Sequence, residues 1–378
     1  MPAGDLRDLS WYFLKLGTLG FGGPIALTGA MQRDLVDTRQ WITPADFAEG
    51  LALAQIAPGP LAAQLAMYIG YLSRGWTGAL VTGGAFVLPS FLMVWALSAA
   101  YVAFDGLPWM TGLFYGVGAA VIAIVARAAW KLWRLSIARD PLLWIVASTV
   151  GIVTVVLERE VVWLFVAGGA VAAVRVHGRT SATLVCLPLA GAPWSLPSAG
   201  FDVALPHIFW FFVKAGALVF GSGLAIVPFL YGGAVQERHW LTDRQFLDAV
   251  AVAMITPGPV VITVAFIGYL LRGTAGMAAA AAGVFLPTYI FVVALAPHFR
   301  RFAARPGTAA FVAGVTAAAT GAIAGAAIVL ARRAWIDPWT IGIGVASLMA
   351  LVWFKLPELW LIAGAAALGL LLHEGGGG

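Results

Sequence analysis

Two stretches decide the fold: residues 53–71, LAQIAPGPLAAQLAMYIGY, and residues 246–269, FLDAVAVAMITPGPVVITVAFIGY. In each stretch a Pro-Gly-Pro triplet interrupts an apolar run. The prolines lack an N–H group and end the helix before them, and the glycine gives the backbone freedom to turn. The helical pieces flanking a triplet are roughly 20 Å long, too short to cross a bilayer singly and too long together for one crossing. We therefore predict a re-entrant hairpin at each triplet, with its tip near the membrane midplane.

The composition of the whole chain is that of a membrane protein. Of its 378 residues, 61% are hydrophobic and only 10% are charged, whereas about a quarter of the residues of a soluble domain are charged. A water-soluble enzyme is therefore excluded. At roughly 20 residues per crossing, the chain has room for about ten to twelve spans. We predict an all-α polytopic membrane protein.

The charged residues and the single cysteine exclude several other classes of protein. The 22 Lys and Arg against 17 Asp and Glu give a net charge of +5. These basic residues sit in short loops between apolar runs, where they set topology, so we expect no nucleic-acid partner. Cys186 is the only cysteine, so the chain has no intramolecular disulfide, Cys-based zinc site or iron–sulfur cluster. We expect no cofactor, no bound metal and no removable signal peptide.

An internal repeat divides the chain into two halves. Shifting the sequence by 199 residues places Phe13, Lys15 and Gly17 over Phe212, Lys214 and Gly216, and places the first triplet over the second. After the triplets the offset falls to 198, and near the end of the repeat it falls to 197. We predict a first repeat over 1–186, a Pro-rich linker over 187–206 and a second repeat over 207–374. The glycines at 375–378 are a tail.

The apolar runs of the two halves follow the same order. In the first half the predicted spans lie near 9–31 (broken at FGGP), 76–103, 109–134, 140–157 and 160–176; in the second they lie near 206–231, 275–298, 308–331, 339–354 and 357–373. Each half therefore has about five full crossings plus one hairpin, and an odd number inverts the second half. Loop charges favour this inverted repeat. If the broken segments cross fully instead, the halves are parallel.

The breaks are the predicted substrate site. Unpaired backbone groups are tolerated inside a membrane only where protein or a water-filled cavity covers them. A fresh helix starting at Pro60 or Pro259 aims its N–H groups and positive dipole end at the midplane, which suits an anion. Kinked packing and helix–helix hydrogen bonds are the competing interpretation. The candidate substrate-binding residues are Gly22, Gly23, Pro58, Gly59, Pro60 and Gln64, with Gly221, Ser222, Gly223, Pro257, Gly258, Pro259 and Thr263 in the second half.

Three repeat-matched pairs of charged residues are candidates for charge or coupling roles: Lys15 and Lys214, Glu49 and Asp248, and Arg39 and Arg238. The lysines precede the FGGP and FGSG breaks, where they add positive potential or else reach the membrane interface. The carboxylates pair with a cation, carry a proton, or are ordinary interfacial groups. The arginines lie beside tryptophans and could form a vestibule for anions.

Catalysis is not supported by the sequence. Ser222 could act as a nucleophile with His207 or His239, but its repeat partner is Gly23 and neither histidine has a matched histidine. The phosphate-binding pattern G-x-x-x-x-G-K-[ST] does not occur, so the chain itself does not hydrolyse ATP. We predict that the protein is not an enzyme and that any driving force is electrochemical.

Taken together, the motifs resemble the chromate ion transporter family in its long, two-domain form. The resemblance covers nearly the whole chain and is carried by FGGPIALTGAMQRDLVDTRQWI (21–42), LAQIAPGPLAAQLAMYIGY (53–71) and FVLPS (86–90), with the echoes FGSGLAIVPFL (220–230), FLDAVAVAMITPGPVVITVAFIGY (246–269) and FLPT (285–288). The second half departs where Pro24 becomes Leu224 and Gln55 becomes Met254, and where Gln64 faces an apolar residue or threonine.

The resemblance implies a multi-pass plasma (inner) membrane transporter that exports chromate and gives chromate resistance. Sulfate is the expected isosteric competitor. The departures between the halves suggest that they have unequal roles. Alternating access around the paired breaks is the expected mechanism. A transporter of sulfate or another oxyanion, or an anion channel of the same fold, is the alternative, and a homodimer is left open.

Overall fold

The computed structural model describes residues 5–21, 23–104, 108–137, 140–158, 161–177, 203–219, 223, 226–299, 306–354 and 356–374. Its regular secondary structure is helical, and no strand occurs among these residues. The predicted all-α class is confirmed. Most of the predicted linker 187–206 lies outside the described residues, as do Cys186 and the glycine tail.

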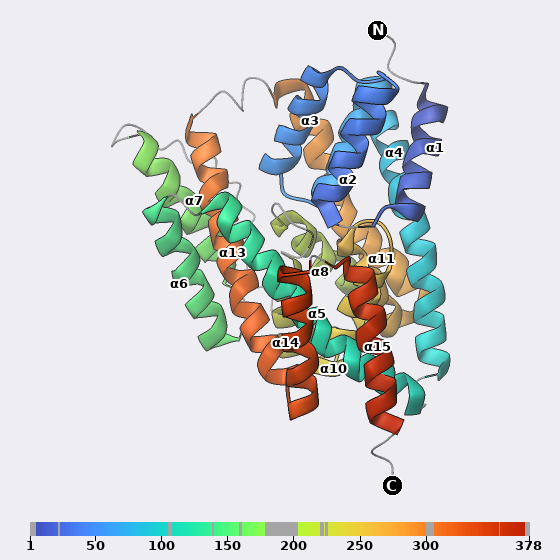
Figure 1. Cartoon of the computed structure of the whole chain (residues 1–378). Helices are drawn as coiled ribbons and strands as arrows, with labels where there is room; N and C mark the ends of the chain where they lie inside the picture. Colours follow the sequence, from blue (N-terminus) through green and yellow to red (C-terminus); the bar gives the residue numbers. More distant parts are fainter. Residues whose placement is uncertain are drawn as a thin grey trace.

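The helices follow the order predicted from the two halves (Figure 1). The first half contains α1 (Leu6–Leu19), α2 (Gly23–Met31), the π-helical η1 (Gln32–Thr38), α3 (Pro44–Ile56), α4 (Leu61–Phe104), α5 (Pro108–Ser136), α6 (Pro141–Leu157) and α7 (Val162–His177). The second contains α8 (Leu205–Leu218), α9 (Ile226–Leu230), η3 (Tyr231–Glu237), α10 (Asp243–Ile255), η4 (Val260–Ile262), α11 (Thr263–Leu295), η5 (Ala296–His298), α13 (Pro306–Ala334), α14 (Pro338–Val352) and α15 (Glu358–Glu374).

Several helices have the length and composition of membrane spans. Within the described residues, four are long and apolar enough to cross a bilayer: Leu61–Phe104, Trp109–Arg134, Val260–His298 and Pro306–Ala334. Shorter apolar helices accompany them at Pro141–Leu157, Trp163–Val176, Leu205–Leu218, Pro338–Val352 and Glu358–Leu372. The chain is a multi-pass membrane protein.

The chain turns back at the first break of each half. The Tyr12 hydroxyl donates to Asp34 Oδ2 over 3.2 Å, which joins α1 to η1. In an unreversed helix these residues would be about 33 Å apart, at 1.5 Å per residue. The Arg238 guanidinium lies 4.7 Å from the ring centroid of Phe211, so the second half reverses in the same way. The predicted single crossings over 9–31 and 206–231 are therefore wrong, because each break folds its two short limbs into a hairpin.

The predicted hairpin at the first Pro-Gly-Pro triplet is present. The side chain of Thr43 caps α3 by accepting from the Asp46 amide, and α3 then runs to the triplet. The chain returns along the first limb of α4. A side-chain carbon added at Gly50 would collide with the ring of Tyr68 and lie 3.1 Å from Leu65 Cδ1, so the two limbs pack directly together.

A second reversal follows inside α4 and inside α11. The backbone leaves helical geometry at Arg74 and Gly75, where Gly75 has φ of 58°. Thr82 Oγ1 then donates to the carbonyl of Ala66 over 2.8 Å, so residues 61–73 and 76–104 lie antiparallel. The matched positions Arg272 and Gly273 form the same reversal. This confirms the predicted boundary between the broken segment and the span that follows it.

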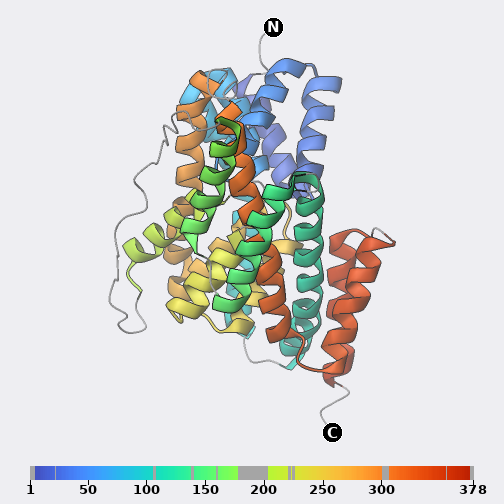
Figure 2. The same ribbon diagram turned by 90° about the vertical axis from the view of Figure 1, so that its left-hand side faces the viewer.

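Glycines let the helices of each half approach closely. A side-chain carbon at Gly17 would collide with the carbonyl of Phe86, and one at the matched Gly216 would collide with that of Val284. These contacts hold α1 on α4 and α8 on α11, while α4 and α11 pack on each other across the halves. Around them, α13 packs on α5, α6 and α7, and α14 and α15 pack on α5 at one side of the molecule (Figure 2).

Candidate functional site

The two Pro-Gly-Pro loops have unusual backbone conformations. Gly59 has φ of +141° and Gly258 has φ of +102°, a region that favours glycine because it has no Cβ. The triplets are buried, and the residues before them, Ala57 and Thr256, end α3 and α10 in extended conformation. Each loop therefore ends one helix and starts another inside the protein.

Each loop is hydrogen-bonded to the first break of the opposite half. The Gly59 amide donates to the carbonyl of Val219 over 2.6 Å, and the Gly258 amide donates to the carbonyl of Gly20 over 3.0 Å. These donors are 199 residues apart in sequence, and so are these acceptors. Gly20 and Val219 are the C-caps of α1 and α8. The crossed pair of bonds gathers all four breaks into one region.

Two hydroxyl side chains extend this crossed arrangement. Ser90 Oγ, from the first half, donates to the carbonyl of Pro257 over 2.6 Å. Its repeat mate Thr288 lies against the other loop, where a carbon added at Gly59 would be 2.8 Å from Thr288 Oγ1. These two residues were not predicted as site residues from the sequence. The sequence feature that could have identified them is their position directly after the matched prolines in FVLPS and FLPT.

The helix that starts at Pro60 presents a free N-terminal turn. Gln64 N donates to the carbonyl of Pro60, but within the described part of the chain no carbonyl from another element accepts from the amides of residues 61–63. The first amides of a helix have no intrahelical partner and carry its positive dipole end. In the second half the matched start is a short 3₁₀ turn, η4, before α11.

Gln64 closes the first loop and has one unused oxygen. Its Nε2 donates to the carbonyls of Ala57 and Pro58 over 3.1 and 2.8 Å. The side chain is completely buried, and its Oε1 is the one buried side-chain nitrogen or oxygen among the described residues without a hydrogen-bond partner. The hydroxyl of Thr263, the candidate in the second half, instead donates to Val260 within its own turn. The two loops are therefore chemically unequal.

Of the remaining site candidates in the first breaks, the structure describes Gly23 and Gly223 only. Gly23 begins α2. Gly223 lies beside the second loop, because a carbon added to it would be 3.4 Å from Val261 Cγ2. Gly22, Gly221 and Ser222 lie outside the described residues.

The candidate basic residues are not brought to the breaks. Lys15 and Lys214 are exposed on α1 and α8. Arg39 lies 4.6 Å from the ring centroid of Trp41, and Arg238 makes the matched contact with Trp240 at 5.5 Å. Arg39 also lies 5.4 Å from the ring centroid of Tyr12 on α1, and Arg238 lies 4.7 Å from that of Phe211 on α8. Each arginine therefore joins its connector to the first helix of its own half.

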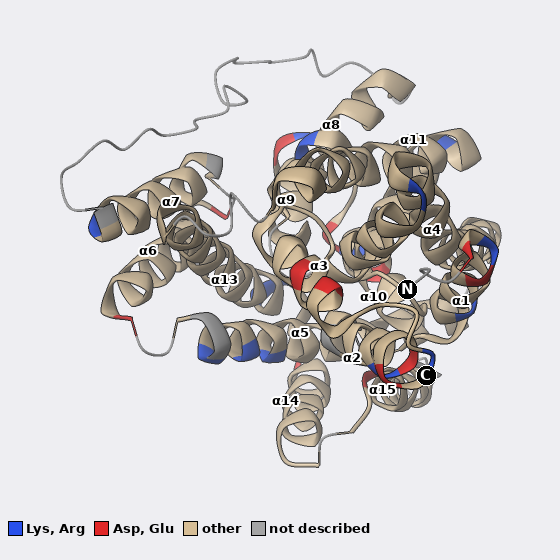
Figure 3. Ribbon diagram, turned by 90° about the horizontal axis from the view of Figure 1, so that it is seen from above, with Lys and Arg blue, Asp and Glu red and all other residues tan. Residues whose placement is uncertain are grey.

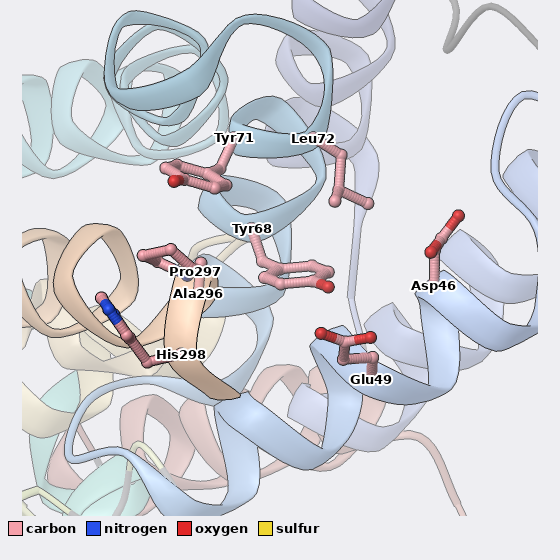
Figure 4. Close-up of a pocket in the computed structure, with 8 residues that line it drawn as sticks. All are labelled: Asp46, Glu49, Tyr68, Tyr71, Leu72, Ala296, Pro297 and His298. Carbon is pink, nitrogen blue, oxygen red and sulfur yellow. The ribbon is translucent and has the colours of Figure 1, made fainter. Parts of the chain in front are cut away.

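The matched carboxylates occupy different surroundings. Glu49 is half-buried and lines a cavity of about 370 Å³ between α3, α4 and η5 (Figure 4). Asp248 is 2% exposed and accepts a hydrogen bond from the Tyr101 hydroxyl over 2.8 Å. The cavity is lined by Asp46, Glu49, Tyr68, Tyr71, Leu72, Ala296, Pro297 and His298. Tyr68 and Tyr71 stand in the stretch 53–71 but were not predicted as site residues, and Tyr101 lies in none of the quoted motifs. Within the described ranges, no three His, Cys, Asp or Glu residues are grouped to hold a metal ion.

Comparison with known proteins identifies the family. The family model described as chromate transporter matches residues 7–174 and again 206–370. The chain is 55% identical to the chromate transport protein of Cupriavidus metallidurans, over 98% of this chain and 94% of that protein. It is 50% identical to the probable chromate transport protein of Synechococcus elongatus, over 98% and 96% of the two chains. It is 35% identical to the chromate transport protein of Pseudomonas aeruginosa, over 85% and 80%.

No solved structure matches the chain. The relatives are named as transport proteins and not as enzymes, which agrees with the exclusion of catalysis from the sequence. The two matched regions cover most of the chain, and two of the relatives are 55% and 50% identical over 98% of it. On these grounds, the chain belongs to the chromate transporter family.

Proposed function

We propose that this protein is a secondary transporter that exports chromate across the plasma membrane by alternating access and so confers chromate resistance. The observation that carries the proposal is the crossed pairing of each Pro-Gly-Pro loop with the first break of the opposite half. Secondary transporters bind substrate where broken helices of two repeats meet. The relatives named for chromate transport support the choice of substrate.

The proposed substrate site is built on the two loops and on the helix starts that follow them. The first-turn amides at residues 61–63 offer donors and a positive dipole end to a tetrahedral oxyanion. Gln64, at the same turn, takes part by holding the first loop through its Nε2, because its unpaired Oε1 is an acceptor and cannot bind a dianion directly. The other proposed members of the site are the two triplets, Gly23, Gly223 and Thr263, together with Gly22, Gly221 and Ser222, which lie outside the described residues. Sulfate has the same shape and charge as chromate and is the proposed competitor.

We further propose that the repeats 1–186 and 207–374 lie inverted in the membrane. Because the chain reverses at its first break, counting crossings no longer fixes their relative orientation. The support comes from Figure 1, in which α3 lies toward the upper end of the molecule and its repeat mate α10 toward the lower end. Reciprocal contacts such as those of Gly59 and Gly258 are what a pseudo-twofold relation between repeats produces.

The membrane potential favours the proposed direction. A dianion that leaves an inside-negative cell gains about 2 × 2.3 kcal/mol per 100 mV. Outward chromate movement therefore needs no coupled ion, although a coupled ion would increase the driving force for export.

Counterflow in proteoliposomes tests the proposal. Vesicles that contain purified protein and unlabelled chromate are diluted into a trace of radiolabelled chromate, with the membrane potential clamped at zero. We expect a transient accumulation of label above equilibrium, and a smaller overshoot when the vesicles are loaded with sulfate. Empty vesicles and vesicles loaded with chloride are the controls.

Each alternative outcome has a distinct meaning. Chromate flux without an overshoot would identify a channel, because a channel gives no trans-stimulation. An overshoot with sulfate only would reassign the substrate. Absence of any flux from correctly folded protein would overturn the proposed function.

A further inference from the structure

The buried side chain of Gln64 has a fixed orientation. Its Nε2 donates to the carbonyls of Ala57 and Pro58 over 3.1 and 2.8 Å, which uses both of its hydrogens. Turning the amide over would set its oxygen against two carbonyl oxygens, so the nitrogen and the oxygen cannot exchange places. Oε1 is therefore an acceptor, and it has no hydrogen-bond partner among the described residues.

This acceptor lies at the free N-terminal turn of α4. Gln64 is the fourth residue of the helix, and its side chain runs back to the loop before the helix start, where Nε2 is bonded. The amides of residues 61–63 belong to the same turn and carry the positive dipole end. One acceptor thus lies beside a set of donors. Because the side chain is completely buried, a ligand that brings a donor to Oε1 satisfies a group that is otherwise costly.

The second half supplies a hydroxyl to the same place. A carbon added at Gly59 would lie 2.8 Å from Thr288 Oγ1 and 2.7 Å from Gln64 Nε2. Thr288 is completely buried, and its hydroxyl donates to the carbonyl of Val284 over a long 3.4 Å. A hydroxyl held by so long a bond can rotate and donate to a ligand.

The second loop has no matching acceptor within the described residues. The hydroxyl of Ser90, which flanks that loop, donates to the Pro257 carbonyl over 2.6 Å. The hydroxyl of Thr263 donates within its own turn, and the neighbouring residue Ile262 is apolar. The buried acceptor Gln64 Oε1 therefore belongs to the first half alone.

The arrangement of charge favours a ligand with fewer negative charges. Seen from above, the acidic residues of α3 lie near the centre of the molecule, whereas basic residues of α1 and α7 lie toward its outer edges (Figure 3). The matched lysines Lys15 and Lys214 are exposed. Negative charge on α3 opposes a dianion more strongly than a monoanion, because the Coulomb energy is proportional to the charge of the ligand.

Tetrahedral oxyanions differ in whether they carry a proton. Near neutral pH, chromate is present partly as hydrogen chromate, which has one hydroxyl, whereas sulfate takes up a proton only in strong acid. A hydroxyl can donate to Oε1 while the other oxygens of the ion accept from amides. An unprotonated oxygen in that place would face the lone pairs of Oε1 and leave the acceptor unpaired.

We propose that the substrate site selects oxyanions that carry a hydroxyl, and that it binds hydrogen chromate with this hydroxyl donating to Gln64 Oε1. The inference rests on the proposed function and names the form of its substrate. The remaining oxygens of the ion accept from the amides of residues 61–63 and from the hydroxyl of Thr288. Each chromate then takes one proton with it, so the membrane potential acts on one charge per ion instead of two. Sulfate binds weakly because it has no hydroxyl at neutral pH.

Two ions that differ in a single hydroxyl test the inference. At pH 8 phosphate is mainly hydrogen phosphate, and monofluorophosphate is a dianion of nearly the same size with fluorine in place of the hydroxyl. Calorimetric titration of the purified protein in detergent measures both dissociation constants at this one pH, so the charge of the protein is the same for both ions. We expect phosphate to bind about ten- to hundredfold more tightly, because monofluorophosphate leaves the buried acceptor unpaired.

Variants of Gln64 assign the preference to the acceptor. Gln64→Met removes Oε1, and the two dissociation constants should then agree within about threefold. Gln64→Glu keeps an acceptor oxygen and should still prefer phosphate by about tenfold or more, even though the loop loses donors. Thr82→Val is the matched control, because it removes another completely buried hydrogen bond of α4, to the carbonyl of Ala66. It should leave the ratio of the two dissociation constants unchanged.

The outcomes separate this inference from the proposed function. Equal binding of phosphate and monofluorophosphate by the wild-type protein, or no binding of phosphate, would overturn the inference without any variant. A preference that survives in Gln64→Met would assign the selection to another group and would also overturn it. Absence of chromate counterflow from protein that keeps the preference would overturn the proposed function alone.

Discussion

The hairpin made by α3 and the first limb of α4 and its repeat mate, made by α10 and the start of α11, have nearly the same local structure. Both begin at a threonine cap, both end at a buried Pro-Gly-Pro loop, and both loops donate their central amide across the halves. The surroundings of the two hairpins differ: α10 packs against α5 and α15, whereas in the described part of the chain α3 makes no comparable contact with their repeat mates α13 and α7. Burial of a carboxylate in this protein is therefore set by the outer helices and not by the hairpin.

This comparison separates a fixed part of the molecule from a variable part. Backbone hydrogen bonds and glycine contacts recur in both halves and hold the breaks together. The helices that pack against α3 and against α10 differ between the halves. Variants at matched positions can test this division, since a fixed contact should respond equally in both halves and a variable one should not.

The largest effect is expected at the central glycines. Gly258→Ala places a carbon against Ser90 Oγ, and Gly59→Ala places one 2.7 Å from Gln64 Nε2 and 2.8 Å from Thr288 Oγ1, each at positive φ. Backbone strain and overpacking together should cost about 3 kcal/mol of unfolding free energy, with chromate flux abolished. Thermal unfolding in detergent and proteoliposome flux measure both effects.

Gly84→Ala is the control for the glycine variants, because Gly84 is helical and no atom lies within 4 Å of an added carbon. It should change stability by less than about 1 kcal/mol. Ser90→Ala combined with Gly258→Ala should recover part of the loss. Wild-type flux in Gly258→Ala would show that the loop geometry is dispensable.

A smaller effect is expected for the hydroxyls that flank the loops. Ser90→Ala removes a buried hydrogen bond of 2.6 Å between the halves and should lower the free energy of unfolding by about 1 kcal/mol. Thr288→Val keeps the shape of the side chain and loses only a bond of 3.4 Å within its own turn, so the loss should be under about 0.5 kcal/mol. Equal shifts in unfolding temperature would contradict the distinction drawn between these contacts.

The smallest effect is expected at the matched N-caps Asp140 and Asp337. The hydrogen bond from Arg175 holds the pKa of Asp140 below its ordinary value. Burial works against ionisation of Asp337, but hydrogen bonds from Tyr115 and Thr340 outweigh it and its pKa is also lowered. A lowered pKa gives stability that is full above the unfolded value of 3.8 and is lost as pH falls through the folded value.

Asparagine retains the capping oxygen and removes the charge. Asp337→Asn should therefore lower the unfolding temperature slightly at pH 7, and the difference from wild type should shrink as the pH falls below about 4. Asp140→Asn should behave alike and be more sensitive to salt, because its ion pair with Arg175 is exposed. A difference that grew on acidification would have the wrong sign for a lowered pKa.

Much of the candidate site could be predicted from the internal repeat and the composition of the chain. The matched triplets predicted the paired hairpins, since Pro-Gly-Pro cannot continue a helix and each flanking piece is too short to cross. The same reasoning failed at FGGP, because the Gly-Pro break was treated as a kink in one crossing. The reversal depends on contacts such as Tyr12 with Asp34, between residues 22 positions apart, and no local pattern specifies them.

The sequence by itself determined the helical class, the two halves, the positions of the breaks and the membrane environment, because these depend on local chemistry: apolar run length, missing N–H groups and recurrence of residue types. Only the tertiary structure decided that each loop binds the opposite half, that the lysines face outward, and that Asp248 is buried while Glu49 faces a cavity. Those outcomes depend on which helices pack together over separations of more than a hundred residues, and equivalent positions in a repeat can pack in two ways.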